Sequence, residues 1–159
     1  MNRSDERTPP IRRIMVALDA SPRNVEMIET SAKLAARLGS ELIGLFVEDI
    51  NLLRMTELPF ASEIGFFSPV SRRLSSGRME REFRAQANWT RRILAGIAER
   101  ENVAWEFRVV RGSIVPELLT AGEEADLLIL GKVGRSLIQR GRIGSTVRLL
   151  LRQRPGLTM

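Results

Sequence analysis

The sequence predicts an α/β fold in which an open parallel sheet carries helices on both faces. Short apolar runs alternate along the chain with longer segments that keep helical spacing. Most of these runs are continuously apolar, as expected for strands that are buried on both faces. Strands that alternate with helices form parallel sheets through right-handed crossovers. The pattern therefore favours one layered domain with a central sheet.

The first half of the chain supplies two strands and one helix. Residues 11–19, "IRRIMVALD", predict a buried strand because apolar side chains run without interruption from Ile14 to Leu18. A helix follows, with Ser21 as its N-cap and Pro22 at its first position, where a missing N–H does no harm. Gly39 is a suitable stop for that helix. The second strand spans residues 41–49, "ELIGLFVED".

Residues 50–77 show no sustained period and contain two prolines, so we expect an irregular or partly helical excursion. A long helix follows from about residue 78 to residue 100, with one apolar face and one face rich in Arg and Glu. The next strand, residues 103–110, places apolar residues on one face and charged residues on the other. The alternating residues are Val103, Trp105, Phe107 and Val109 against Glu106 and Arg108.

The last part of the chain adds a helix, a strand and a final helix. Gly112 is expected to turn the chain into a short helix over residues 116–124. The apolar run of residues 126–130 predicts a fourth strand, and residues 145–152 predict a closing helix.

Composition limits the class of protein. A chain of 159 residues is long enough for one well-packed domain, which we place at residues 11–159 after a disordered tail of residues 1–10. The absence of Cys and His excludes disulfides, thiolate chemistry and Ser/His/Asp or Cys/His catalysis. No apolar segment is long enough to span a bilayer, so we expect a cytoplasmic protein. A net charge of +6 favours anionic partners.

The segment "GKVGRSLIQRGRIGST", residues 131–146, follows the fourth predicted strand directly. Gly131 and Gly134 permit a loop whose backbone N–H groups face an anion closely. Gly144, Ser145 and Thr146 open a helix whose N-terminus favours phosphate. The segment is neither a P-loop nor a G-x-G-x-x-G fingerprint, and it has the form G-x2-G-x9-G-S. Its glycines also suit a flexible surface loop, and that alternative stays open.

The motifs "MVALDAS", "LFVED", "VVRG" and "DLLILGKVGRSLIQRGRIGSTV" together resemble the universal stress protein family, specifically its ATP-binding branch. The resemblance implies a Rossmann-like fold, similar to adenine nucleotide alpha hydrolases, with strand order 3-2-1-4-5. The family's fifth strand would begin where this chain reads "RPGLTM", so we expect it to be truncated or missing.

The resemblance also implies a binding site for ATP with Mg or Mn. Asp19 would lie near the ribose and, indirectly, the metal, and Val47 would meet the adenine through its main chain. The other implied contacts are Ala17, Leu130, Gly131, Gly134, Arg135, Gly144, Ser145 and Thr146. A purely structural role remains an alternative for three of these residues. Asp19 also suits a helix cap, Val47 suits a plain core position, and Arg135 suits a solvated helix face.

Three function classes follow from these observations. The first is an ATP-binding stress protein that acts as a nucleotide-responsive regulatory module and not as an enzyme. The second is a slow ATPase or phosphotransferase, which lacks an evident base near the glycines. The third is a basic module that binds nucleic acid or a protein partner without nucleotide. Nucleic acid is disfavoured because aromatics are 5% of the chain and Trp89 and Trp105 are assigned to packing. A homodimer or other self-association is expected, and a membrane partner is not.

Overall fold

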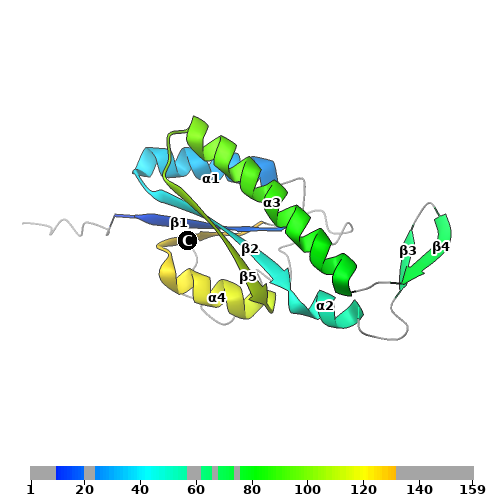
Figure 1. Cartoon of the computed structure of the whole chain (residues 1–159). Coiled ribbons are helices and arrows are strands. Elements are labelled where there is room, and N and C mark those ends of the chain that lie inside the picture. The colour runs from blue at the N-terminus through cyan, green and yellow to red at the C-terminus, as the bar shows by residue number, and fades with distance from the viewer. Residues whose placement is uncertain (1–9, 20–23, 57–61, 66–67, 74–75, 132–159) are drawn as a thin grey trace, which may run out of the picture.

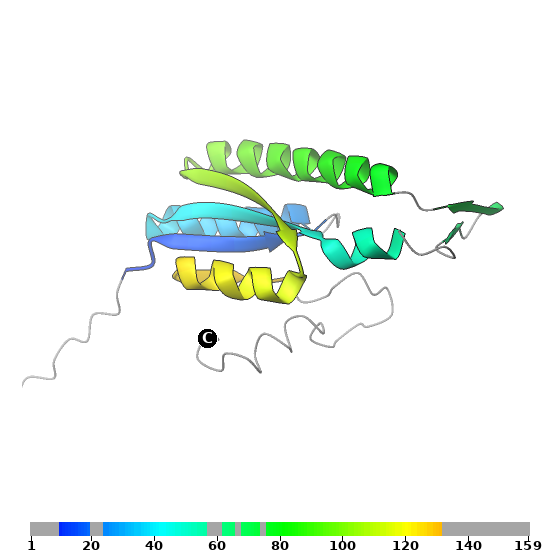
Figure 2. The same ribbon diagram turned by 60° about the horizontal axis from the view of Figure 1, so that its bottom comes forward.

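The computed structural model describes residues 10–19, 24–56, 62–65, 68–73 and 76–131. Within this part of the chain, a parallel sheet lies between two layers of helices. Helices α1 (Asn24–Leu38) and α3 (Ser76–Arg100) cover one face, and α4 (Ile114–Glu124) covers the other (Figures 1 and 2). The predicted arrangement of helices on both faces of an open sheet is confirmed.

The main sheet has four strands in the order β5-β2-β1-β6, and every neighbouring pair is parallel. They are β1 (Arg13–Leu18), β2 (Glu41–Asp49), β5 (Trp105–Gly112) and β6 (Leu127–Ile129). Counted along the chain, these are the first, second, third and fourth strands of the sheet, so the predicted order 3-2-1-4 is confirmed. The residues from which a fifth strand was expected lie outside the described part.

The central strand β1 is buried on both faces. Ile14, Met15 and Val16 have no exposed surface. Ile14 and Val16 belong to the core on the α1 and α3 side, whereas Met15 belongs to the core on the α4 side. The prediction that this uninterrupted apolar run is a strand packed between two layers of helices is therefore confirmed.

The helices α1 and α3 end in left-handed backbone conformations beside the sheet. Gly39 follows α1 with φ +64, as predicted for a helix stop, and Asn102 follows α3 with φ 56. Gly44, in the middle of β2, allows α3 to approach the sheet closely. A Cβ added there would lie 2.7 Å from Cδ2 of Leu94, which has no exposed surface.

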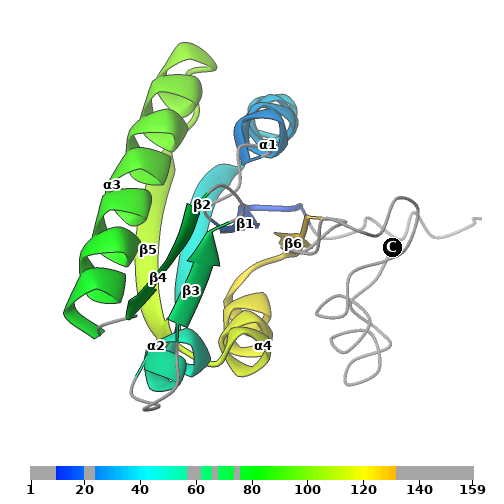
Figure 3. The ribbon, with the colours of Figure 1, turned by 90° about the vertical axis from the view of Figure 1, so that its right-hand side faces the viewer.

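Residues 50–77 form a helix, α2 (Ile50–Thr56), and an antiparallel hairpin of β3 (Ser62–Gly65) and β4 (Ser68–Arg73). The helical part of the prediction is confirmed, but the hairpin was not predicted. The reason is that strands of 4 and 6 residues are too short to show a period, and Pro69 argues against a strand. Figure 1 shows the hairpin apart from the main sheet, and Figure 3 looks along the molecule from the hairpin side, with β3 and β4 in front of the sheet.

Two boundaries near β5 differ from the prediction. The strand is shifted toward the C-terminus, and Gly112 ends it opposite Asp49 instead of lying beyond it. Helix α4 begins at Ile114, before the expected residue 116, because proline is tolerated in the first turn of a helix. The predicted helix over residues 145–152 lies outside the described part.

Only one of the two tryptophans packs as predicted. Trp105 packs against the core on the α1 and α3 side, but the assignment of Trp89 to packing was wrong, since 40% of its surface is exposed on α3. A large apolar residue at the edge of a helix's apolar face fits the helical period whether its ring is buried or exposed. Spacing alone therefore did not decide whether Trp89 is buried. No helix in the described segments is long and apolar enough to cross a membrane.

Candidate functional site

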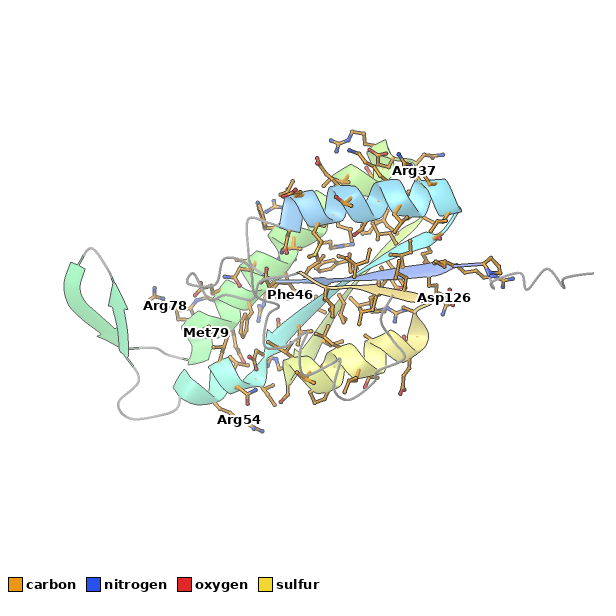
Figure 4. All side chains as sticks on the ribbon, turned by 180° about the vertical axis from the view of Figure 1, so that it is seen from behind. Arg37, Phe46, Arg54, Arg78, Met79 and Asp126 are labelled. Atoms are coloured by element: carbon orange, nitrogen blue, oxygen red, sulfur yellow. The ribbon has the colours of Figure 1, made fainter. Side chains whose placement is uncertain are left out.

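The four parallel strands end along one edge of the sheet, which we call the carboxyl edge. Leu18 of β1 lies opposite Phe46 of β2, and Val16 lies opposite Ile129 of β6. Asp19, Val47 and Leu130 directly follow three of these paired residues, so all three reach the carboxyl edge. In open α/β sheets, ligands bind beyond this edge. In Figure 4, Arg78 and Met79 mark the start of α3 near the carboxyl edge. Asp126 marks the other end of the sheet, where the strands begin.

Three predicted site residues form an apolar floor just below the carboxyl edge, on the α4 side. Ala17, Val47 and Leu130 are half-buried and pack against the core that includes α4. Val47 also pairs with Val110 of β5. The side chain of Val47 therefore has the core role that was left open in the sequence. Its main-chain contact with adenine stays a prediction.

The connection between β1 and α1 is held by a side chain that sequence reasoning missed. Asn24 is 2% exposed, and its Nδ2 donates a hydrogen bond to the main-chain carbonyl of Asp19. A buried amide needs such a partner, because an unpaired one would be costly. The bond fixes the first residue of α1 beside the end of β1. Ser21 and Pro22, the predicted start of the helix, lie outside the described residues.

The glycine segment starts next to the same helix. Gly131 is exposed, and a Cβ added to it would lie 3.9 Å from Sδ of Met27 in the first turn of α1. The first predicted glycine is thus placed beside the N-terminal turn of α1, where unsatisfied backbone N–H groups favour an anion. Gly134, Arg135, Gly144, Ser145 and Thr146 lie outside the described residues, so their contacts stay predictions.

An ion-pair network crosses the carboxyl edge next to the apolar floor. Nε of Arg111 on β5 donates to Oε2 of Glu48 on β2 at 2.8 Å, and its Nη1 donates to Oε1 of Glu80 on α3 at 3.3 Å. The hydrogen bond to Glu48 is the main cause that raises the pKa of Arg111, so the guanidinium stays charged. The network joins two strands and a helix. Sequence reasoning missed it, because nothing in the sequence pairs residues so far apart.

The carboxylates at this edge have different hydrogen-bond partners. Asp49 accepts hydrogen bonds from the backbone N and the Nδ2 of Asn51, at 2.9 and 3.0 Å, and so caps α2. Glu48 pairs with Arg111, as described above. Among the described residues, no group of three or more His, Cys, Asp or Glu side chains could hold a metal ion. Whether Asp19 assists a metal or caps a helix stays a prediction.

The arrangement suits the binding of an anionic ligand with an apolar ring better than it suits a reaction. The edge offers an apolar floor, a helix N-terminus and the start of a glycine segment. A carboxylate that is already engaged as a cap or an ion pair is a poor candidate for a general base.

Comparison with protein families matches residues 10–155 to one described as the universal stress protein family. A comparison with curated proteins gives no match. Among solved structures, a universal stress protein family member from Burkholderia pseudomallei is similar, with 22% identity, a TM-score of 0.57 and 92% of each chain covered.

Two further similar structures contain nucleotides. One is a universal stress protein from Archaeoglobus fulgidus in complex with dAMP, with 20% identity, a TM-score of 0.55, and 91% of this chain and 92% of that chain covered. The other is a universal stress protein in complex with cAMP, with 20% identity, a TM-score of 0.51 and 91% of each chain covered. At this identity, the likeness concerns the fold.

Proposed function

Because this chain belongs to the universal stress protein family, we propose that it binds ATP at the carboxyl edge and acts as a nucleotide-responsive regulatory module. The observation that carries the proposal is the convergence of Ala17, Asp19, Val47 and Leu130 at one edge, with Gly131 next to the start of α1. The related structures with dAMP and cAMP support an adenine nucleotide as the class of ligand.

In this proposal, the floor of Ala17, Val47 and Leu130 lies under the nucleoside. The glycine segment, of which Gly131 is the first residue, receives the phosphates. Positive charge in that segment and the N-terminus of α1 would both stabilise the triphosphate. Mg or Mn is proposed to accompany the phosphates, with Asp19 assisting indirectly.

Titration calorimetry with ATP, with and without MgCl₂, tests the proposal. Gly134→Asp is the decisive variant because it places a negative side chain where phosphate is expected, and we expect ATP binding to be lost. Gly96→Asp is the matched control, since Gly96 is exposed on α3 and has no atoms within 4 Å of an added Cβ. Unchanged affinity in folded Gly134→Asp would refute the phosphate assignment.

The role of Asp19 is separable by one variant. If its carboxylate assists the metal or ribose, Asp19→Ala lowers ATP affinity by about 1–3 kcal/mol, the range for hydrogen bonds to charged groups. If the carboxylate only caps the helix, the melting temperature falls and the affinity does not. Our proposal requires the first result.

We propose that ATP hydrolysis is incidental. Phosphoryl transfer needs a positioned nucleophile as well as bound phosphates, and Asp49 and Glu48 are engaged in other contacts. A slow ATPase or phosphotransferase is the alternative. Turnover faster than about one per second, within the ordinary range for enzymes, would favour that alternative and refute the regulatory proposal.

Self-association is part of the proposal. Among the described strands, β6 pairs only with β1, and an unpaired strand edge invites pairing with another chain. Sedimentation velocity over a range of protein concentrations tests this. A monomer at the highest concentration would refute it.

A further inference from the structure

We propose that the outer face of α3 binds single-stranded nucleic acid, a partner separate from the nucleotide at the carboxyl edge. The surface consists of four arginines, which we call the arginine stripe, together with the exposed ring of Trp89. The members of the stripe are Arg81, Arg84, Arg91 and Arg92, and all are exposed.

The helical period places these arginines on one side of α3 in two neighbouring rows. Arg84 and Arg91 are seven residues apart, and Arg81 and Arg92 are eleven apart, so each pair returns to nearly the same direction after whole turns. The stripe extends about 16 Å along the helix at about 1.5 Å per residue. The opposite side of α3 is buried against the sheet and α1, as Phe83, Ala87 and Leu94 show.

The charges of the stripe are uncompensated within the described part of the chain, where none of the four arginines forms an ion pair. By contrast, Arg108 on β5 pairs with Glu106 and Glu124 at 2.8 and 2.6 Å.

The acidic residues near the start of α3 also have other partners. Glu80 pairs with Arg111, and Glu82 accepts a hydrogen bond from Gln86. A row of like charges without counter-charges favours an anionic partner.

Arginine and tryptophan together distinguish nucleic acid from other anions. A guanidinium contacts phosphate oxygens in a bidentate way, and an exposed aromatic ring stacks on a base. Trp89 is 40% exposed and lies three residues before Arg92, so its ring and a guanidinium are neighbours on the helix surface. An amphipathic helix that inserts into a membrane needs a free apolar face, whereas that of α3 is packed into the core. An acidic peptide has no base to stack on Trp89.

Fluorescence anisotropy of a labelled single-stranded 20-mer, titrated with the full chain, tests the inference. Four phosphate contacts predict a slope of log K against log salt of about −2.8, which is about a 50-fold loss of affinity between 50 and 200 mM salt. Excess ATP should leave the binding in place. Complete displacement by ATP would put the oligonucleotide in the nucleotide site and refute the inference.

Two variants and a matched control locate the surface. Arg84→Gln combined with Arg91→Gln should reduce the magnitude of the salt slope by about 1.4. Lys33→Gln combined with Arg37→Gln removes the same charge from exposed positions on α1, and should leave the slope unchanged. Equal losses in the two double variants would mean that only net charge matters, which contradicts the proposal.

Trp89→Ala separates nucleic acid from other polyanions. Loss of one stacked base lowers affinity about 5- to 150-fold. The same variant should not weaken binding of polyglutamate or of phosphatidylserine vesicles. An oligonucleotide affinity unchanged in Trp89→Ala, or tighter binding of either of the other anions by the unaltered chain, would overturn the assignment to nucleic acid. Thermal melts confirm that each variant is folded.

Discussion

Replacing Gly44 by alanine tests how closely α3 approaches the sheet. Gly44 lies in β2 between Val16 and Phe107. A Cβ at this position would be 2.7 Å from Cδ2 of Leu94 and 3.1 Å from side-chain atoms of Leu18 and Phe107. The nearest of these contacts is shorter than carbon atoms tolerate, and Leu94 is fully buried, so it has little room to move.

The expected cost follows from two opposing effects. Overpacking a core costs about 1–3 kcal/mol. Replacing glycine by alanine also restricts the unfolded chain, which stabilises the fold by about 0.4–1 kcal/mol. We therefore expect Gly44→Ala to lower the free energy of unfolding by about 1–2 kcal/mol, which is about 2–8 °C in melting temperature for a domain of this size.

Urea denaturation and thermal melts followed by circular dichroism measure this loss. Gly96→Ala is the matched control, because Gly96 is exposed on α3 with nothing within 4 Å of an added Cβ, and alanine should stabilise the helix there by about 0.5–1 kcal/mol. Leu94→Ala makes room for the new methyl group, so Gly44→Ala should cost little in that background. The reasoning is refuted if Gly44→Ala is as stable as the unaltered protein, or if its cost is the same with Leu94→Ala.

Three further substitutions probe other contacts of the fold. The backbone N–H groups of Arg12 and Arg13 lower the pKa of Asp126 below its ordinary 3.8, so its contribution to stability is present above that pH and lost as the pH falls through the folded-state pKa. Asp126→Asn should lower the melting temperature at pH 7, and this difference should shrink at pH 3; an equal difference at both would contradict it. Asn24→Ala removes the hydrogen bond that this buried side chain donates to the carbonyl of Asp19, and should cost about 1–3 kcal/mol in urea denaturation. Gly39→Ala forces a side chain into φ +64, and should cost about 1 kcal/mol; a neutral result would show that the backbone there adapts freely.

The sequence predicted the elements best where the apolar pattern was strongest. The second strand has the bounds that were predicted, residues 41–49, and Gly39 stops the preceding helix as expected. It predicted least in residues 50–77, where the strands of the hairpin are too short to produce a period. The predicted start of β5 was two residues too early for a related reason. Val103 is buried just before the strand, so it extends the apolar alternation of the strand although it does not belong to it.

The sequence predicted which strand ends form the candidate site, but not the side-chain contacts that join them. Parallel strands bring their carboxyl ends to one edge, so the placement of Asp19, Val47 and Leu130 follows from the order of elements. The contacts of Arg111 join residues 63 and 31 positions apart in the sequence, and depend on how β2, β5 and α3 pack. No local pattern encodes such a distance, and only the folded chain reveals it.

The structure shows which arginines of the described part have acidic partners and which do not. In the sequence, arginines are spread over the chain, and a long helix with many of them is most simply a solvated face. The fold separates them into two groups. Arg108 and Arg111 on β5 are bound to carboxylates, whereas the arginine stripe on α3 has no acidic partner among the described residues. A paired arginine contributes to the order of its neighbours, and an unpaired one is available to a partner. Helix α3 itself carries six arginines against three glutamates, so within the described part its outer face is the surface on which an anionic macromolecule should be sought.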